Sequence, residues 1–411
     1  MWERMLKKSL YERITPMKII AVLEEKITSG GGFNQATNAI LQMQRICEGR
    51  FSFEVFTTHP ENLQYLKRLG LTAHVFTNLL INRLVTKLNT SRWWQITQSH
   101  YSVFSPLEKK LLNHGCDLVY FVTPGGTSRS LQKLNYIATI WDLCHLEAPI
   151  FPEVRESNEF FKREHYFRNN LGPAVIILTD SNQLARVASF RYGVSPVRFL
   201  PMPFAPSPFL EHEHALSKDD VLKKHNLKEG YYYYPAQFWA HKNHIRILEA
   251  LLLLNSNDLK SRVVFSGKDY GNRKYLEDFV YEHSLQEQVS FLGFVPIEDM
   301  RGLYEGSLAV VMPTYFGPTN LPPLEAWSLG KPLIYSAHLE EQAGNAALLI
   351  NPDNPNEIAE AMVRCNDSAI RWQLIEAGKH RLNYFANQRA IAEKDLLGRL
   401  EQFAAQRRCW R

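Results

Sequence analysis

The chain has few cysteines and no long hydrophobic run. Its five cysteines are odd in number among 411 residues, and no two of them have the short spacing typical of a metal site. The sequence therefore predicts a reducing compartment, with neither a disulfide framework nor a zinc site. No stretch of about 18 apolar residues is present, so no membrane-spanning helix is predicted. The charged N-terminal stretch also lacks the apolar segment of a secretory signal, and a cytoplasmic location is expected.

Acidic residues are missing from one long window, Asn62 to Pro106, although the net charge of the chain is only +5. Trp93 and Trp94 lie in this window, together with the basic residues Lys67, Arg68, Arg83, Lys87 and Arg92. Basic and amphipathic aromatic side chains together favour peripheral contact with an anionic membrane surface. The alternative is an ordinary solvated helix face whose tryptophans pack inward.

The length and the apolar pattern indicate two α/β domains. A chain of 411 residues exceeds one ordinary core, and its 45% hydrophobic and 22% charged residues are typical of a globular protein. Apolar runs of strand length alternate with amphipathic stretches, which predicts mostly parallel sheets covered by helices. The predicted strands are 17–23, 51–58, 116–122, 135–142 and 174–181 in the first half, and 231–236, 262–267, 289–295, 308–313, 332–336 and 346–350 in the second.

Four prolines in residues 197–209 interrupt this alternation and predict a linker. We therefore expect a first domain over residues 1–205 and a second over 206–387. Predicted helices include 34–47, 244–254 and 272–284. A further amphipathic helix, expected over 388–406, belongs to a C-terminal segment, 388–411, that packs back toward the first domain.

Parallel sheets bind ligands beyond the carboxyl ends of their strands, so loops at those positions are the candidates for chemistry. Residues 30–32 are three glycines between a strand and a helix, suited to backbone contact with a phosphate or a sugar, with a plain flexible turn as the alternative. Asp142 ends another predicted strand and His145 follows it. This pair is either part of a substrate site or a structural feature.

Two further loops carry charged residues. Lys242 precedes a predicted helix, where its ammonium and the helix amides suit a diphosphate, unless the lysine is merely solvated. In the stretch PTYFGPTNLPPLEAW, prolines are expected to hold the loop extended, so that the amides of Thr319, Asn320 and Leu321 stay unpaired. Glu325 is expected in the first turn of the next helix, where it binds a ribose diol or only caps the helix.

Taken in order, the motifs of the second half resemble the donor-binding domain of retaining glycosyltransferases of the GT-B fold, in the group often called family four. The match runs through PAQFWAHKNHIRILEAL, VVFSGKDYGN, VSFLGFVPIEDMRGLY, VMPTYFGPTNLPPLEAWSLGKPLIYS and EQAGNAALLINPDNPNEIAEAM. The first domain matches more loosely, through its glycine loop and WDLCH. The resemblance implies two Rossmann-like α/β domains facing across a cleft. It also implies transfer of a sugar from a nucleotide-diphosphate sugar to an acceptor, with retention of configuration and without a metal or other cofactor.

The resemblance implies roles for individual residues. Glu325 matches the second acid of the E-x7-E motif, which holds the ribose, and Lys242 matches the lysine that neutralises the departing diphosphate. Asp142 and His145 resemble the strand-end catalytic pair of relatives, and Phe294 and Val295 match the loop against the base. The remaining donor-binding positions are Gly31, Gly32, Gln237, Ser266, Gly267, Thr319, Asn320 and Leu321.

Three positions depart from the family pattern. Gly317 stands where the first acid of E-x7-E is expected, Gln237 stands in place of an arginine, and Trp141 precedes Asp142 where relatives have histidine. The segment FGPTN is similar to a subgroup of bacterial surface-polysaccharide enzymes, many of them mannosyltransferases. GDP-mannose is therefore favoured as donor, with a UDP-sugar as the alternative. A glycan or lipid-linked molecule is expected as acceptor, with no nucleic-acid partner. The alternatives are a catalytically weak scaffold or binding subunit, and an epimerase or phosphorylase of the same fold.

Overall fold

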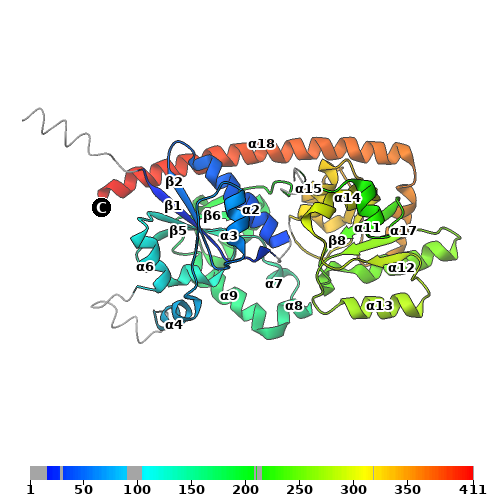
Figure 1. Cartoon of the computed structure of the whole chain (residues 1–411), viewed down its shortest axis with the longest axis horizontal. Coiled ribbons are helices and arrows are strands. Elements are labelled where there is room, and N and C mark those ends of the chain that lie inside the picture. The colour runs from blue at the N-terminus through cyan, green and yellow to red at the C-terminus, as the bar shows by residue number, and fades with distance from the viewer. Residues whose placement is uncertain are drawn as a thin grey trace, which may run out of the picture.

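The computed structural model describes residues 16–27, 31–89, 104–207, 210, 215–317 and 319–410. Two α/β domains lie side by side, and one long helix, α18, runs along both of them (Figure 1). Trp93, Trp94, Arg92, Gly30 and Pro318 lie outside the described residues. The two predicted parallel-sheet domains are thus confirmed.

The first domain is built on a seven-stranded parallel sheet in the order β3-β2-β1-β4-β5-β6-β7. Its strands are β1 Lys18–Leu23, β2 Ser52–Thr57, β3 Ala73–Val75, β4 Leu118–Phe121, β5 Asn135–Ile140, β6 Ile176–Thr179 and β7 Phe199–Pro201. Its helices are α2 Gly31–Cys47, α3 Asn62–Arg68, α4 Leu79–Asn89, α6 Pro106–Asn113, α7 Cys144–Glu147, α8 Pro152–Arg155, α9 Glu159–Asn170 and α10 Asn182–Tyr192, with a short 3-10 helix η2 at Gly126–Ser130.

The second domain has a six-stranded parallel sheet in the order β10-β9-β8-β11-β12-β13. Its strands are β8 Tyr231–Pro235, β9 Val263–Ser266, β10 Val289–Phe291, β11 Ser307–Met312, β12 Leu333–Ser336 and β13 Leu348–Ile350. Its helices are α11 Lys218–Lys224, α12 His244–Ser256, α13 Arg273–Glu282, α14 Ile297–Gly306, α15 Leu321–Ser328, α16 Glu340–Ala343 and α17 Pro355–Arg364, and the 3-10 helix η6 spans Ala240–Lys242.

Both sheets are covered on their two faces, which explains why their strands are continuous apolar runs rather than alternating ones. The four consecutive tyrosines of β8 are the polar exception, and all four are buried. Their hydroxyls find partners: Tyr231 donates to the Leu303 carbonyl at 2.7 Å, and Tyr234 donates to the Lys242 carbonyl at 2.9 Å. Since a buried hydroxyl without a partner is costly, these bonds make the run compatible with a core strand. The bond to Lys242 also holds the turn after β8.

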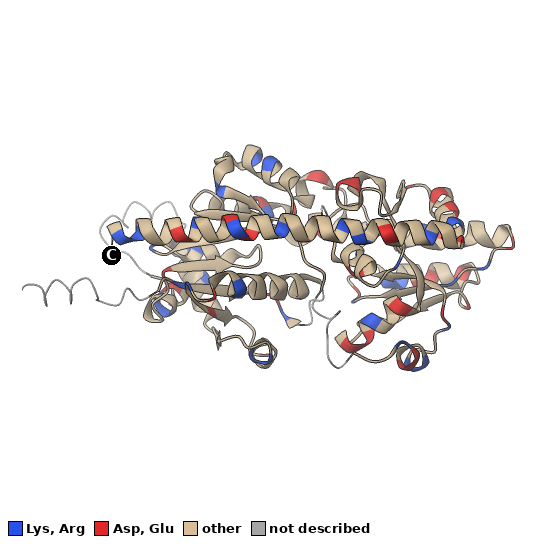
Figure 2. Ribbon diagram, turned by 90° about the horizontal axis from the view of Figure 1, so that it is seen from above, with Lys and Arg blue, Asp and Glu red and all other residues tan. Residues whose placement is uncertain are grey.

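Helix α18 spans Ser368–Gln406, so the predicted helix over 388–406 begins twenty residues too late. Near its start, Leu374 and Gly378 are buried in the second domain, where Gly378 lies against the Trp327 ring. Near its end, Ala392, Leu396, Leu400 and Phe403 are buried in the core cluster of the first domain. Basic and acidic residues are interspersed along α18, as expected for a helix with a solvated side (Figure 2).

Two other predicted boundaries are wrong. Residues Phe199–Pro201 form β7, which pairs in parallel with β6, so the proline-rich segment begins as an edge strand and not as linker. Proline is tolerated there because an edge strand leaves one side of its backbone unpaired. Helix α2 begins at Gly31 rather than at residue 34, which places Gly31 and Gly32 in the first helical turn.

Candidate functional site

The carboxyl ends of the two sheets face a first cavity, which we call cavity A, of about 390 Å³. First-domain residues contribute one wall and second-domain residues the other. The residues predicted for the site that line it are Gly31, Gly32, Asp142, Gln237, Lys242, Thr319, Asn320 and Leu321. Loops far apart in the sequence are thus brought together as the strand-end argument predicted.

A second cavity, cavity B, has a volume of about 630 Å³. It is lined by the predicted residues Gly31, Gln237, Ser266, Gly267, Phe294, Val295, Leu321 and Glu325. Cavities A and B share lining residues, among them Gln237, Leu321 and Pro322, so they adjoin at the start of α15. Lys242 and Glu325 therefore line adjoining spaces rather than separate regions of the molecule.

Lys242 ends η6, immediately before α12. Its Nζ donates to Asn320 Oδ1 at 3.4 Å, and the side chain is partly buried against cavity A. Burial lowers the pKa of Lys242 to about 8, although the nearby Asp142 and Glu153 carboxylates oppose that shift. A cation so poorly solvated gains more from an anionic ligand than a surface lysine does.

Asn320 occupies the space that the missing acid of the E-x7-E motif leaves. Gly317 has φ +109°, and a Cβ placed on it would lie 2.8 Å from Asn320 Oδ1. The Asn320 amide nitrogen donates to the Gly317 carbonyl and to the Tyr335 hydroxyl, each at 2.8 Å. Gly317 is thus required both by its backbone conformation and by this packing. A carboxamide, which is neutral, lies beside Lys242 at this position.

The predicted role of Pro322 and Pro323 is wrong, whereas Pro318 lies outside the described residues. Pro322 and Pro323 are the second and third residues of α15, within its first turn, where a missing N–H costs nothing. They begin the helix and do not hold a loop extended. The backbone N–H of Asn320 is also not free, since it donates to Gln342 Oε1 at 2.9 Å.

Glu325 is the fifth residue of α15, so its expected place in the first turn is wrong as well. The carboxylate is buried, and it accepts hydrogen bonds from the Ser207 and Tyr304 hydroxyls. Burial raises the pKa of Glu325, and these two hydrogen bonds oppose the rise. Each carboxylate oxygen has two lone pairs, so both can still accept a bond from a ligand in cavity B.

The loop that was expected against a base lines the far side of cavity B. Phe294 is 56% exposed there, whereas Val295 is buried. Gly267 approaches the turn after β8 so closely that a Cβ would lie 2.3 Å from the Ala236 carbonyl oxygen. Ser266 holds the end of β9, where its hydroxyl lies 2.7 Å from that of Tyr233. Cavity B is thus lined by the closely packed ends of β8 and β9 and by one exposed aromatic ring.

Asp142 and His145 are separated by the structure. Burial acts to raise the pKa of Asp142, but the Arg163 guanidinium, paired with it, and the Cys144 backbone N–H lower it overall. At cavity A, Asp142 is thus an ionised carboxylate that is already paired with Arg163. His145 is fully buried, with Nε2 3.2 Å from Glu164 Oε1. The structure therefore does not bring His145 to these cavities, because its ring packs against Phe167 in the first-domain core.

Sequence reasoning missed the pair His241 and Glu153. The ring of His241 packs on Phe316 with centroids 3.8 Å apart, and its Nδ1 contacts the Glu153 carboxylate. Glu153, on α8 of the first domain, also accepts the His241 backbone N–H at 3.0 Å. Burial lowers the pKa of His241, which the Glu153 hydrogen bond opposes. This pair joins the two domains beside Lys242, and 88 residues of separation left no local signal for it.

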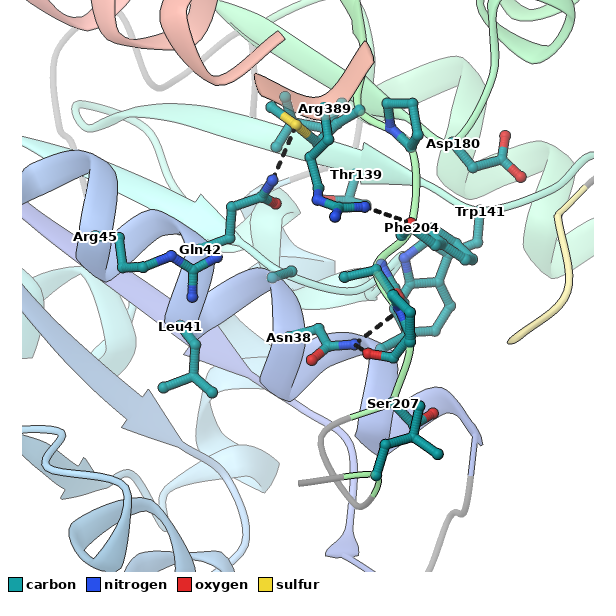
Figure 3. Close-up of a pocket in the computed structure, with 18 of the residues that line it drawn as sticks. Asn38, Leu41, Gln42, Arg45, Thr139, Trp141, Asp180, Phe204, Ser207 and Arg389 are labelled. Carbon is teal, nitrogen blue, oxygen red and sulfur yellow. Dashed lines mark hydrogen bonds between the residues drawn. The ribbon is translucent and has the colours of Figure 1, made fainter. Parts of the chain in front are cut away.

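A third cavity, cavity C, has a volume of about 720 Å³ (Figure 3). It shares Gln35, Trp141 and Phe204 with cavity A, so the two adjoin. The segment between the domains crosses cavity C. Asn38 Nδ2 donates to the Pro206 carbonyl at 2.9 Å, and Arg389 from α18 donates to the Phe204 carbonyl at 2.9 Å. Since Ser207 binds Glu325, this segment connects the second-domain carboxylate to first-domain helix α2.

Asp180, directly after β6, is a second residue that sequence reasoning missed. Its carboxylate is 3% exposed, borders cavity C, and has no hydrogen-bond partner within the described residues. Burial raises the pKa of Asp180 to about 7, which nearby Thr319 opposes.

Solved structures of other proteins support the predicted GT-B fold. The chain superposes on the structure of Anabaena HepE in complex with UDP and glucose with a TM-score of 0.65, at 14% identity, covering 94% of this chain and 99% of that one. WaaG, a glycosyltransferase involved in lipopolysaccharide biosynthesis, gives a TM-score of 0.60 at 14% identity, covering 92% and 99%. The predicted GT-B fold is confirmed.

Residues 217–381, most of the second domain, match the family model described as glycosyl transferases group 1. The predicted resemblance to this family is confirmed. The O-antigen chain mannosyltransferase RfbU of Salmonella typhimurium is 28% identical over 172 residues, which cover 38% of this chain and 47% of that one. O-antigen chain mannosyltransferase B of Escherichia coli is 30% identical over 143 residues, covering 34% and 38%. The matches thus span less than half the length of these two relatives.

Proposed function

We propose that the protein is a retaining glycosyltransferase that moves a sugar from a nucleotide-diphosphate sugar to a glycan or lipid-linked acceptor of a surface polysaccharide. One observation carries this proposal: Lys242 and Glu325 line adjoining cavities that meet at the start of α15, between the strand ends of two domains. GDP-mannose is the favoured donor because of FGPTN and the mannosyltransferase relatives. A UDP-sugar is the alternative, since HepE was crystallised with UDP.

The proposed step needs charge stabilisation at the diphosphate. The bond from the anomeric carbon to the diphosphate oxygen breaks, the acceptor oxygen bonds to that carbon, and the acceptor proton passes to the departing diphosphate. Negative charge grows on the diphosphate, next to the Lys242 ammonium and the N-terminal end of α15. A preorganised cation and helix dipole in a partly buried site stabilise such charge. We propose that this suffices without a metal ion.

In this arrangement Glu325 accepts hydrogen bonds from the ribose, and Phe294 lies against the base in cavity B. Asn320 takes the position of the first acid of the E-x7-E motif, so the sugar meets a carboxamide there. Gln237 supplies no positive charge to the diphosphate. Besides Lys242 in cavity A, the basic residues Lys268 and Arg68 border the adjoining cavity B.

The direct test is a thermal-shift screen of GDP, UDP, GDP-mannose, UDP-glucose and UDP-N-acetylglucosamine, followed by turnover assays with the best binder. A ligand that binds only the folded chain raises its melting temperature. We expect a shift with one nucleotide family and acceptor-dependent release of that nucleotide. Binding without turnover would favour the scaffold alternative, motivated by Gly317 and Gln237, and product formation without acceptor would favour an epimerase.

Donor binding is expected to weaken as pH rises through about 8, the pKa to which burial lowers Lys242, because the ammonium loses its proton there. The variant Lys242→Arg keeps its charge throughout, so its donor affinity should stay level over the same range. Titration of donor binding from neutral to alkaline pH measures both. Parallel curves for the two proteins would contradict an ionic contact between Lys242 and the donor.

Membrane contact is the second part of the proposal. No helix in the described part of the chain is long and apolar enough to span a bilayer. Helix α4, however, presents an apolar face to solvent, with Leu80 75% and Leu84 69% exposed, beside exposed Arg83. Exposed leucines flanked by basic groups suit the surface of an anionic bilayer. We propose that α4 brings the site to a lipid-linked acceptor.

Replacing Leu80 and Leu84 together with serine is expected to abolish most binding to vesicles that contain phosphatidylglycerol, because the apolar contact is lost. The matched variant Leu259→Ser changes an exposed leucine of the second domain and should bind as wild type does. Co-sedimentation at low and high salt measures binding, which should fall with salt as the charges are screened. Equal binding by both variants, or no binding at all, would remove α4 as the contact.

A further inference from the structure

Three side chains on the first domain converge outside the cavities described above. Glu54 lies on β2, His74 on the neighbouring strand β3, and His114 directly follows α6. His74 Nε2 is 3.4 Å from Glu54 Oε2, and His114 Nδ1 is 3.8 Å from the same oxygen. One potential ligand atom from each of the three side chains lies within 4.8 Å of the other two. The group lies away from the carboxyl ends of the strands, since His114 precedes the start of β4.

The two oxygens of the Glu54 carboxylate have different surroundings. Its Oε1 pairs with Lys18 Nζ at 2.6 Å. Its Oε2 is inaccessible to solvent and has no hydrogen bond within the described residues, although both imidazoles face it. An acceptor oxygen that is buried and lacks a hydrogen bond is costly, so a ligand that engages it lowers the free energy of the folded chain.

The two imidazoles are held by packing rather than by other hydrogen-bond acceptors. Phe56 stacks on the His74 ring with centroids 5.2 Å apart and meets the His114 ring edge-on at 5.1 Å. The two histidine rings are 4.9 Å apart. Both histidine side chains are about one third exposed, at 35% and 32%, so an ion and a water molecule have access from solvent.

We propose that Glu54, His74 and His114 bind one divalent transition metal ion, with zinc the best match, and with water completing the coordination. Zinc favours four nitrogen and oxygen ligands at about 2.0–2.2 Å, so ligand atoms of a tetrahedral site are about 3.3 Å apart. The two distances from the imidazoles to Glu54 Oε2 need to close by only a few tenths of an ångström. The partly exposed rings can rotate to shorten the distance between their nitrogens. Magnesium and calcium prefer all-oxygen ligands and should not bind.

Neighbouring charged groups lower the expected affinity for a metal ion but do not occupy the site. Lys18 already bonds the far oxygen of Glu54, and Lys110 directs its ammonium to the Val75 carbonyl at 2.7 Å, while lying 5.4 Å from the Phe56 ring centre. Asp117 nearby is paired with Arg407 at 2.6 Å. The bound ion would connect the edge strand β3 to β2 and to α6. It would thus stabilise the edge of the sheet, independently of the proposed sugar transfer.

The test uses the full chain, freed of metal by a chelator that is then removed. Zinc chloride alone should raise the melting temperature, magnesium chloride should not, and equilibrium dialysis should find about one zinc ion per chain. Cobalt substitution should give the visible absorption of a tetrahedral site. The variants His74→Gln and His114→Gln should each lower zinc affinity at least tenfold, as ligand loss does.

The control is His283→Gln, which removes an exposed histidine of the second domain and should leave zinc binding unchanged. Should a ligand variant fail to fold, the dialysis and the cobalt spectrum of the wild-type chain still decide. No zinc retained by the wild-type chain, or equal binding by His74→Gln and His283→Gln, would overturn the proposal and leave a simple cluster of ion pairs.

Discussion

Replacing Lys242 with alanine should reduce sugar transfer about 100- to 1,000-fold, the usual cost of removing one group that stabilises developing charge. Lys242 is the second-domain cation of cavity A, where a diphosphate would meet the start of α15. The loss should fall mainly on kcat, since the charge to be stabilised grows as the bond to the sugar breaks. Steady-state kinetics with the donor found by the thermal-shift screen measure it.

The fold should survive this change. The Lys242 ammonium bonds Asn320 Oδ1 at 3.4 Å, and the Asn320 side chain keeps its bonds to Gly317 and Tyr335. Lys274→Ala, on the exposed face of α13, is a matched control that should keep wild-type rates. If Lys242→Ala turned over donor as fast as Lys274→Ala, the assignment of the diphosphate site would be wrong.

Glu325→Gln should weaken donor binding by about 10- to 100-fold, because a charge-assisted hydrogen bond contributes about 1.5–3 kcal/mol. Glutamine keeps the volume, and the Ser207 and Tyr304 hydroxyls can rotate to pair with it. Alanine would instead leave both hydroxyls buried without a partner and destabilise the fold. Titration calorimetry with the nucleotide diphosphate measures the loss.

Tyr304→Phe separates a structural role of Glu325 from a binding role. It removes one bond to the carboxylate and leaves the carboxylate itself in cavity B. We expect this variant to melt at a lower temperature than wild type while keeping most of its donor affinity. Glu325→Gln with unchanged donor affinity and a lowered melting temperature would show that Glu325 only ties the linker segment to the second domain.

Local patterns in the sequence were sufficient for the longer strands and for the family resemblance. Parallel strands buried on both faces appear as apolar runs, and each predicted run contains a strand. The strand-end loops were therefore located correctly, and most predicted donor residues line cavities A and B. Two short edge strands were missed, β3 and β7. At β7 the reason is that proline, which usually marks a loop, is tolerated at a sheet edge.

The sequence predicted helix starts and side-chain directions less well. Gly31, Pro322 and Pro323 were interpreted as loop residues, yet they occupy first turns of helices, where neither glycine flexibility nor a missing N–H disrupts the hydrogen bonding. His145 follows a strand just as Asp142 does, but Asp142 lines cavity A, whereas the ring of His145 packs against Phe167. No spacing rule distinguishes these two outcomes.

The sequence alone determined the alternation of the main strands and helices, the two-domain plan, and the lysine and the carboxylate on which the proposed chemistry depends. Each of these follows from neighbours within a few residues, through periodicity and motif. Only the tertiary structure decided that Glu153 bonds His241, that Ser207 and Tyr304 engage Glu325, and that Asn320 fills the space beside Gly317. Most of these contacts join segments far apart in the chain, and all depend on packing, which periodicity and motif do not encode.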